Sequence, residues 1–187
     1  MANEYLVPEE GTLSQILFAD HATDFGAAPA TAANSLIIGT PTDVQMDMTS
    51  VAASGGARQS AQVDLGVNRA PAYSFTMCSE HAVAPSDADA MYLYWNPSPS
   101  STAATGNTGG CTGSDAVFTD TVGNLSQMQR IGPLGLRNNV INIGYVGTIA
   151  PKHRHGSLVL VNQADQAMHT AMDETHIVMT PIIPEIQ

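Results

Sequence analysis

The segment Ala72-Tyr73-Ser74-Phe75-Thr76-Met77 alternates small or polar residues with large apolar ones. This period of two places Tyr73, Phe75 and Met77 on one face of an extended strand. The same alternation, or a short apolar run, recurs at 36–38, 44–48, 61–65, 91–95, 141–149, 158–161 and 177–180. Turn residues separate most of these segments, and no stretch sustains the 3.6-residue apolar period of a helix. The pattern predicts an all-β fold, an antiparallel β-sandwich, for which a jelly roll is one arrangement of about eight strands.

The two ends of the chain differ in pattern. Residues 1–34 show no sustained period, whereas residues 35–187 contain all of the predicted strands, including a bulged or edge strand at 127–136 that Gly and Pro interrupt. We therefore expect an extended N-terminal arm at 1–34 and a β-sandwich domain at 35–187. The arm is expected to contact a neighbouring subunit through its apolar side chains, Tyr5, Leu6, Val7, Leu17 and Phe18.

Charge is scarce and unevenly distributed. Only 12% of the 187 residues are charged, about half the usual fraction of roughly 25%. Lys152 is the only lysine, which suits a surface that packs against neighbours, because interfaces are depleted in lysine. The net charge of −11 argues against a nucleic-acid partner. Residues 1–57 hold seven acidic residues and no Lys or Arg, so they form either a solvated acidic surface or a docking surface for a basic partner.

We expect neither a membrane-spanning helix nor a secretory signal in this sequence. No apolar run reaches the roughly 18 residues that a membrane-spanning helix needs. The first residues carry neither a basic segment nor an apolar run, so no secretory signal is expected. Cys78 lies in a strand pattern and Cys111 in a long Gly-, Ser- and Thr-rich loop at 96–115. A disulfide between them is the alternative, and the sequence alone does not decide their pairing. Two free thiols are the state that we expect, as in a protein made in a bacterial cytoplasm.

The densest basic segment is Lys152-His153-Arg154-His155. On a strand, His153 and His155 would lie on one face and could share a metal ion, but a third ligand close in sequence is missing. The alternative is a basic turn that contacts the acidic face of a neighbouring subunit. We favour this alternative and assign all four residues to an interface.

Other motifs do not indicate catalysis. The chain has neither the Gly-x-Ser-x-Gly segment of a nucleophilic serine nor the Gly-Lys-Ser of a phosphate-binding loop, so neither enzymatic activity nor a cofactor is expected. Asp87 and Asp89 lack the further ligands of a calcium loop and indicate an exposed acidic turn. Tyr94 and Trp95 are expected near a packed interface or in the core. Together with Tyr92 they would alternatively form a row of rings on which a sugar stacks.

Two segments resemble a known group of proteins. One runs from 92–100 (Tyr-Leu-Tyr-Trp-Asn-Pro-Ser-Pro-Ser) to 109–116, and the other from 146–151 through 156–162 to 177–181. They resemble small virion structural proteins of tailed bacteriophages, of the type found beside the major capsid protein.

The resemblance implies a head decoration (cement) protein, a β-sandwich without catalytic residues that clamps neighbouring capsid subunits. Its implied partners are the major capsid protein and further copies of itself, as a dimer or trimer. Its implied place is the capsid surface of the virion, after synthesis in the host cytoplasm. The alternative function is a carbohydrate- or receptor-binding module of a phage tail or fibre, which would use the row at Tyr92, Tyr94 and Trp95 and the loop at 96–115.

Overall fold

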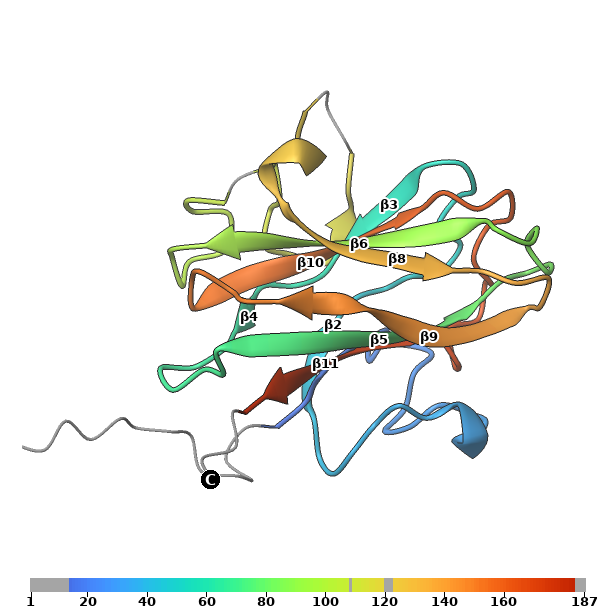
Figure 1. Ribbon diagram of the computed structural model, residues 1–187, viewed down its shortest axis with the longest axis horizontal. Helices are drawn as coiled ribbons and strands as arrows, with labels where there is room; N and C mark the ends of the chain where they lie inside the picture. The colour runs from blue at the N-terminus through green and yellow to red at the C-terminus, as the bar shows by residue number, and fades with distance from the viewer. Residues whose placement is uncertain (1–13, 108, 120–122, 184–187) are drawn as a thin grey trace, which may run out of the picture.

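Two β-sheets pack face to face in the computed structural model, which describes residues 14–107, 109–119 and 123–183 (Figure 1). Sheet A has the strand order β2 (Thr42–Gln45), β1 (Ile16–Ala19), β11 (His176–Ile182), β5 (Ala72–Glu80) and β9 (Ile141–Ile149). Sheet B has the order β7 (Ala116–Val117), β3 (Gly56–Gln59), β10 (His155–Asn162), β6 (Ala90–Ser98) and β8 (Gln129–Gly135), with β4 (Val63–Asp64) paired to β10. The described helices are single 3-10 turns, η1 (Ala32–Asn34) and η2 (Leu125–Gln127). The predicted all-β sandwich is confirmed.

The strand order follows jelly-roll winding. Taken along the chain, β1, β3, β5, β6, β8, β9, β10 and β11 give the order 1-11-5-9 in sheet A and 3-10-6-8 in sheet B. These strands pair antiparallel with their neighbours, and the first strand of the roll, β1, pairs with the last, β11. This nesting of early strands against late ones is the arrangement of two Greek keys. β2 is an addition to it, because β2 pairs parallel with β1.

The core lies between the sheets and consists of the side chains that the period of two points inward. Phe75 and Met77 of β5 face Leu93 and Trp95 of β6, and all four are fully buried. Burying a side chain of this size contributes about 1.5–3 kcal/mol. The segments whose alternation was clearest in the sequence therefore supply the strands that hold the sandwich together.

β8 and β9 bring the two sheets together along one side of the sandwich (Figure 1). At Gly132 an added Cβ would lie 2.1 Å from the Val146 carbonyl oxygen, and at Gly147 one would lie 2.3 Å from the Ile131 carbonyl oxygen. The two backbones thus meet where neither strand carries a side chain. β8 is an edge strand whose register shifts opposite Leu93 and Tyr94, as its interrupted sequence predicted.

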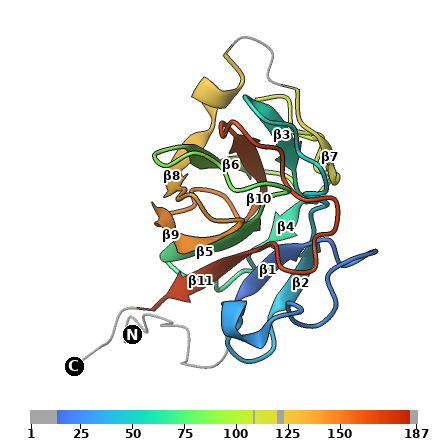
Figure 2. The same cartoon turned by 90° about the vertical axis from the view of Figure 1, so that its right-hand side faces the viewer.

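The predicted boundary of the arm at residue 34 is wrong. β1 lies inside sheet A between β2 and β11 (Figure 2), so residues 16–19 belong to the sandwich. Leu17 and Phe18, which were expected to contact a neighbour, are fully buried within the chain itself. Tyr5, Leu6 and Val7 lie outside the described residues.

Connecting segments cover the outer faces of both sheets. Phe25, Leu36 and Ile37 pack on Leu17 and Val178 of sheet A, so the predicted strand at 36–38 is instead an irregular part of this cover. On sheet B, the side chains of Cys111, Phe118, Leu125 and Met128 pack over Tyr92, Tyr94, Val159 and Val161. None of the helices in the described ranges is long and apolar enough to cross a membrane.

Candidate interaction surfaces

The outward face of β9, the edge strand of sheet A that lies beside β8, is the first candidate surface. This strand has nine residues without a charged side chain or a proline. Ile143 and Tyr145 point away from the core and are 46% and 62% exposed. A groove of about 380 Å³ runs beside them and is bordered by Leu134 and Gly135 of β8. We call the groove and these two side chains the β9 edge.

The second candidate surface is formed by the loops β4–β5 and β9–β10 at one end of the sandwich. Antiparallel pairing places Asp64 of β4 opposite His155 of β10. The Arg154 guanidinium donates from Nε to Asp64 Oδ1 at 2.5 Å and from Nη2 to Oδ2 at 2.6 Å. These bonds from Arg154 lower the pKa of Asp64 to about 2.

The same end exposes further positive charge. Lys152 and His153 are exposed in the β9–β10 loop. Arg69, in the β4–β5 loop, donates weakly to the Lys152 carbonyl oxygen at 3.5 Å. We call Arg69, Lys152 and Arg154 the basic end. The structure thus places Lys152, His153 and Arg154 in an exposed turn and His155 at the start of β10, where it is partly buried. The carboxylate that Arg154 contacts is Asp64 of its own chain.

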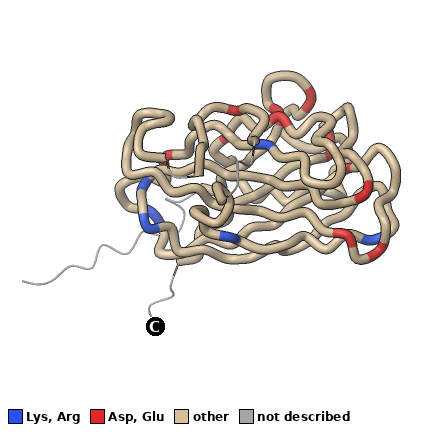
Figure 3. The backbone as a smooth tube through the Cα atoms, turned by 90° about the horizontal axis from the view of Figure 1, so that it is seen from above, with Lys and Arg blue, Asp and Glu red and all other residues tan. Residues whose placement is uncertain are grey.

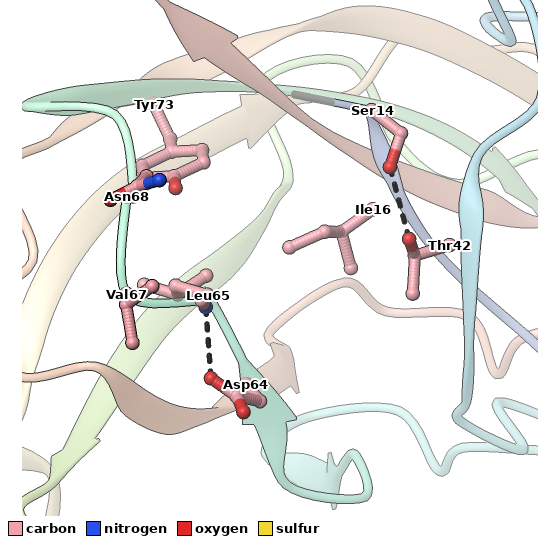
Figure 4. A pocket seen from close by; sticks show the side chains of 9 residues that line it. Ser14, Ile16, Thr42, Asp64, Leu65, Val67, Asn68 and Tyr73 are labelled. Atoms are coloured by element: carbon pink, nitrogen blue, oxygen red, sulfur yellow. Dashed lines mark hydrogen bonds between the residues drawn. The ribbon is translucent and has the colours of Figure 1, made fainter. Parts of the chain in front are cut away.

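A hollow of about 310 Å³ opens beside the basic end (Figure 4). Ile16 of β1, Leu65 and Tyr73 give it an apolar floor, and Val67 stands at its rim with 75% of its surface exposed. On the far side Ser14 and Thr42 hold β1 and β2 together through a hydroxyl pair at 3.0 Å. The hollow is open and lined mainly by apolar groups, so it suits an apolar side chain better than a polar ligand.

The opposite end of the sandwich is acidic. The Asp165 carboxylate accepts hydrogen bonds from the Ser86 hydroxyl at 2.6 Å and the Ser86 backbone N–H at 3.2 Å. The hydrogen bond from the Ser86 hydroxyl is the main cause that lowers the pKa of Asp165. Asp89 accepts from the Asp165 N–H at 2.9 Å, and Asp87 accepts from the Asn138 N–H at 2.8 Å. We call Asp87, Asp89 and Asp165 the acidic end.

The aromatic row does not form a platform for a sugar. Trp95 is fully buried in the core between the sheets. Tyr92 and Tyr94 lie on the other face of the strand, under the cover of sheet B, where the Arg130 guanidinium stacks 4.7 Å from the Tyr92 ring centre. A strand points alternate side chains to opposite faces, so these three rings cannot stack on one ligand.

The long loop after β6 is anchored to sheet B. Its Thr112 exchanges hydrogen bonds with Gln59 of β3, at 2.8 Å through its hydroxyl and 2.9 Å through its N–H. Arg58 of the same strand contacts Asp115 at 2.8 Å. The described part of the loop is therefore packed, and it carries Cys111 onto the outer face of sheet B.

Several titratable groups are buried in the sandwich and have shifted pKa values. Burial raises the pKa of the Cys78 and Cys111 thiols to about 12, and both cysteines are free. Burial also lowers the pKa of His81, whose two ring nitrogens have no hydrogen-bond partner, and that of His176. Across residues 14–107, 109–119 and 123–183, no three His, Cys, Asp or Glu side chains are grouped so that they could hold a metal ion.

Sequence reasoning missed the hollow, and of the acidic end it predicted the turn at Asp87 and Asp89 but not the contact with Asp165. Both join segments that are far apart in the chain, such as Ser86 with Asp165, and no local pattern reports such a contact. The chain matches no protein-family model, and no curated protein sequence is significantly similar to it.

Proposed function

We propose that this chain is a structural subunit of a phage particle, a decoration protein that binds at junctions between capsid subunits. The two segments that resemble small virion proteins lie mainly in β6, β9, β10 and β11, which form much of the sandwich. A jelly-roll sandwich is an architecture that viral capsid proteins use, although lectins and enzymes use it too. The fold is therefore compatible with the proposal, and the specific support for it comes from the surface.

The observation that carries the proposal is the β9 edge. Natural sheets usually protect an edge with lysine, proline or inward-pointing charge, because an unprotected edge pairs with other chains. β9 has none of these along its nine residues and exposes Ile143 and Tyr145 instead. The backbone of β9 meets β8 at Val146 and Gly147, so the two exposed side chains are the part that a partner can cover. Exposed apolar side chains of this kind suit a protein that is held against a partner.

Decoration would act through the sum of many weak contacts. A chain with 12% charged residues and a single lysine has few long charged side chains whose conformational entropy would be lost at each contact. Many symmetric copies then reinforce a shell, because the contacts of one particle are multivalent. This mechanism requires no catalytic group.

The first test is the location of the protein. Purified particles are expected to contain the chain in many copies, detected by mass spectrometry and by antibody labelling of the head. Particles that lack the chain altogether, or that carry it only at the tail, would overturn the proposal.

The second test is add-back of purified protein to particles that lack it. Wild-type protein is expected to bind and to raise the temperature at which the heads release DNA. The double variant Ile143→Lys and Tyr145→Lys should bind to the particles at least about tenfold more weakly than wild type. A loss of about 1.4 kcal/mol in binding free energy suffices for a tenfold change in Kd. The matched control is Val117→Lys, because Val117 is 70% exposed on β7, at the far edge of sheet B. Equal binding by the β9-edge variant and the control would show that this edge is not the contact.

A further inference from the structure

The charges of this sparsely charged protein are separated along its long axis (Figure 3). The basic end holds three of the six Lys and Arg residues, and among the residues that the structure describes Asp64 is the carboxylate that pairs with it. The loops 81–89, 136–140 and 163–175 at the other end hold five carboxylates and one cation, Arg137. β9 runs from one end to the other, so its nine residues separate the two ends by about 30 Å.

The two ends also differ in the shape of their apolar surface. Beside the basic end lies the hollow lined by Ile16, Leu65 and Tyr73. The acidic end instead exposes two apolar side chains, Val83 at 58% and Val140 at 43%. Val83 lies in the same loop as Asp87. Val140 lies two residues after Asn138, whose backbone N–H donates to Asp87. An apolar projection bordered by carboxylates is thus matched by an apolar hollow bordered by cations.

We propose that a second copy of this chain binds end to end, with Val83 of one copy in the hollow of the next. Asp87 and Asp165 of the first copy then approach Arg69 and Lys152 of the second. Exposed ion pairs contribute little by themselves, so the charges mainly select the orientation and the apolar contact holds it. Like ends repel each other, which excludes a symmetric pairing of two basic or two acidic ends.

Such a contact is heterologous, because the two copies use different surfaces. Every open assembly keeps one free basic end and one free acidic end. Such an assembly either adds further copies as a row or closes into a ring. This suits repeated placement on a shell, where a weak lateral contact is multiplied by the number of copies. The inference deepens the structural role proposed above and rests on it. Its test is made in solution, so a failure removes this contact without bearing on whether the protein is found in particles.

The experiment compares three purified proteins by sedimentation velocity over a range of concentrations. The basic-end variant carries Arg69→Glu and Lys152→Glu, both in exposed loops. The acidic-end variant carries Val83→Arg, which places a cation on the projection without touching the hydrogen bonds of Asp87. Val117→Arg, the same substitution at a side chain exposed on β7, is the matched control. Circular dichroism and thermal unfolding establish that all variants are folded.

Wild type and the control are expected to associate at about 0.05 M salt and to associate more weakly at about 0.5 M, where the charges that select the orientation are screened within a few ångströms. Each end variant alone should associate at least about tenfold more weakly. An equimolar mixture of the two variants should form a heterodimer and nothing larger, because only one intact basic end and one intact acidic end remain in each pair. The proposal is overturned by a wild type that stays monomeric, by end variants that associate like wild type, or by a mixture that stays monomeric or grows beyond two chains.

Discussion

At the scale of single residues, Gly156 and Trp95 show how closely the core is packed. A Cβ added at Gly156 would lie 2.3 Å from Cζ2 of the Trp95 ring and 2.8 Å from the Asn96 carbonyl oxygen. β10 and β6 pair directly at this point, so neither backbone is free to yield. The only tryptophan of the chain is thus positioned by the absence of a side chain on the neighbouring strand.

Gly156→Ala is expected to destabilise the fold by about 1–3 kcal/mol, the usual cost of overpacking a filled core. Urea unfolding followed by circular dichroism measures the change. Gly135→Ala is the matched control, because a Cβ at Gly135 meets no atom within 4 Å. Equal losses in the two variants would mean that the approach of Trp95 to β10 is not a constraint.

His81 is the second informative residue, because it is buried with both ring nitrogens unpartnered. Burial lowers its pKa, against a smaller opposing effect of the nearby Asp165 and Asp89 carboxylates. In the unfolded chain the ring titrates near its ordinary pKa of about 6.5. The unfolded state therefore binds more protons than the folded state below about pH 6.5, and stability falls as the pH decreases.

The free energy of unfolding of wild type is expected to decline as the pH falls below about 6.5, because a histidine with a lowered pKa must be charged on unfolding. His81→Phe should flatten this decline at little cost at pH 8, since the ring has no hydrogen bond to lose. Unfolding curves at each pH compare it with His153→Phe, which replaces an exposed histidine. Parallel pH profiles for wild type and His81→Phe would contradict the assignment.

At the scale of elements, the sequence predicts two kinds of strand: alternating strands such as β5 and β6, and apolar runs such as those in β10 and β11, which are buried on both faces. β5 and β6 alternate because their inner residues meet the core while their outer residues are half-buried. β1 is buried on both faces, its inner residues by the core and its outer residues by Phe25 and Ile37, so its four residues show no alternation. β3, with the sequence Gly-Ala-Arg-Gln, has no apolar pattern to recognise.

The candidate surfaces follow the same logic. The basic turn at 152–155 and the acidic turn at Asp87 and Asp89 are contiguous in sequence and were predictable. The hollow joins Ser14, Thr42 and Leu65, whose proximity depends on the parallel pairing of β2 with β1. Charge and hydrophobic patterns report local exposure, whereas a surface built from several loops depends on the winding of the whole chain.

A truncation tests the place of β1. Removing residues 1–13 takes away none of the residues that the structure describes, and the shortened chain is expected to fold. Removing residues 1–19 deletes β1, so β11 loses the backbone hydrogen bonds that it makes with β1. The deletion also removes Phe18 from the core and leaves a cavity there, so this chain should not fold. Soluble yield and circular dichroism separate the two. A folded, soluble product lacking 1–19 would restore the separate arm ending at residue 34.

At the scale of the whole molecule, the winding ties both ends of the chain into one unit. Ile16 pairs with Met179, so the first and last strands are neighbours in sheet A and no boundary divides the described sandwich into parts. The covers on the outer faces are integrated as well, since Leu17 and Val178 serve both the sheet and its cover. Cooperative unfolding of all layers at once is the physical consequence of such shared contacts.

Three side chains report on the three layers of this unit. Trp95 lies in the core, Cys78 lies on the outer side of sheet A, and Cys111 belongs to the cover of sheet B. Both thiols are buried with a pKa of about 12, so they should react with an alkylating reagent only after their layer opens. In urea, Trp95 fluorescence and the labelling of each cysteine, counted by mass spectrometry in short pulses, are expected to change at one midpoint. Labelling of Cys111 before the fluorescence of Trp95 changes would instead show that the cover of sheet B opens on its own. The loop after β6 would then unfold independently of the sandwich.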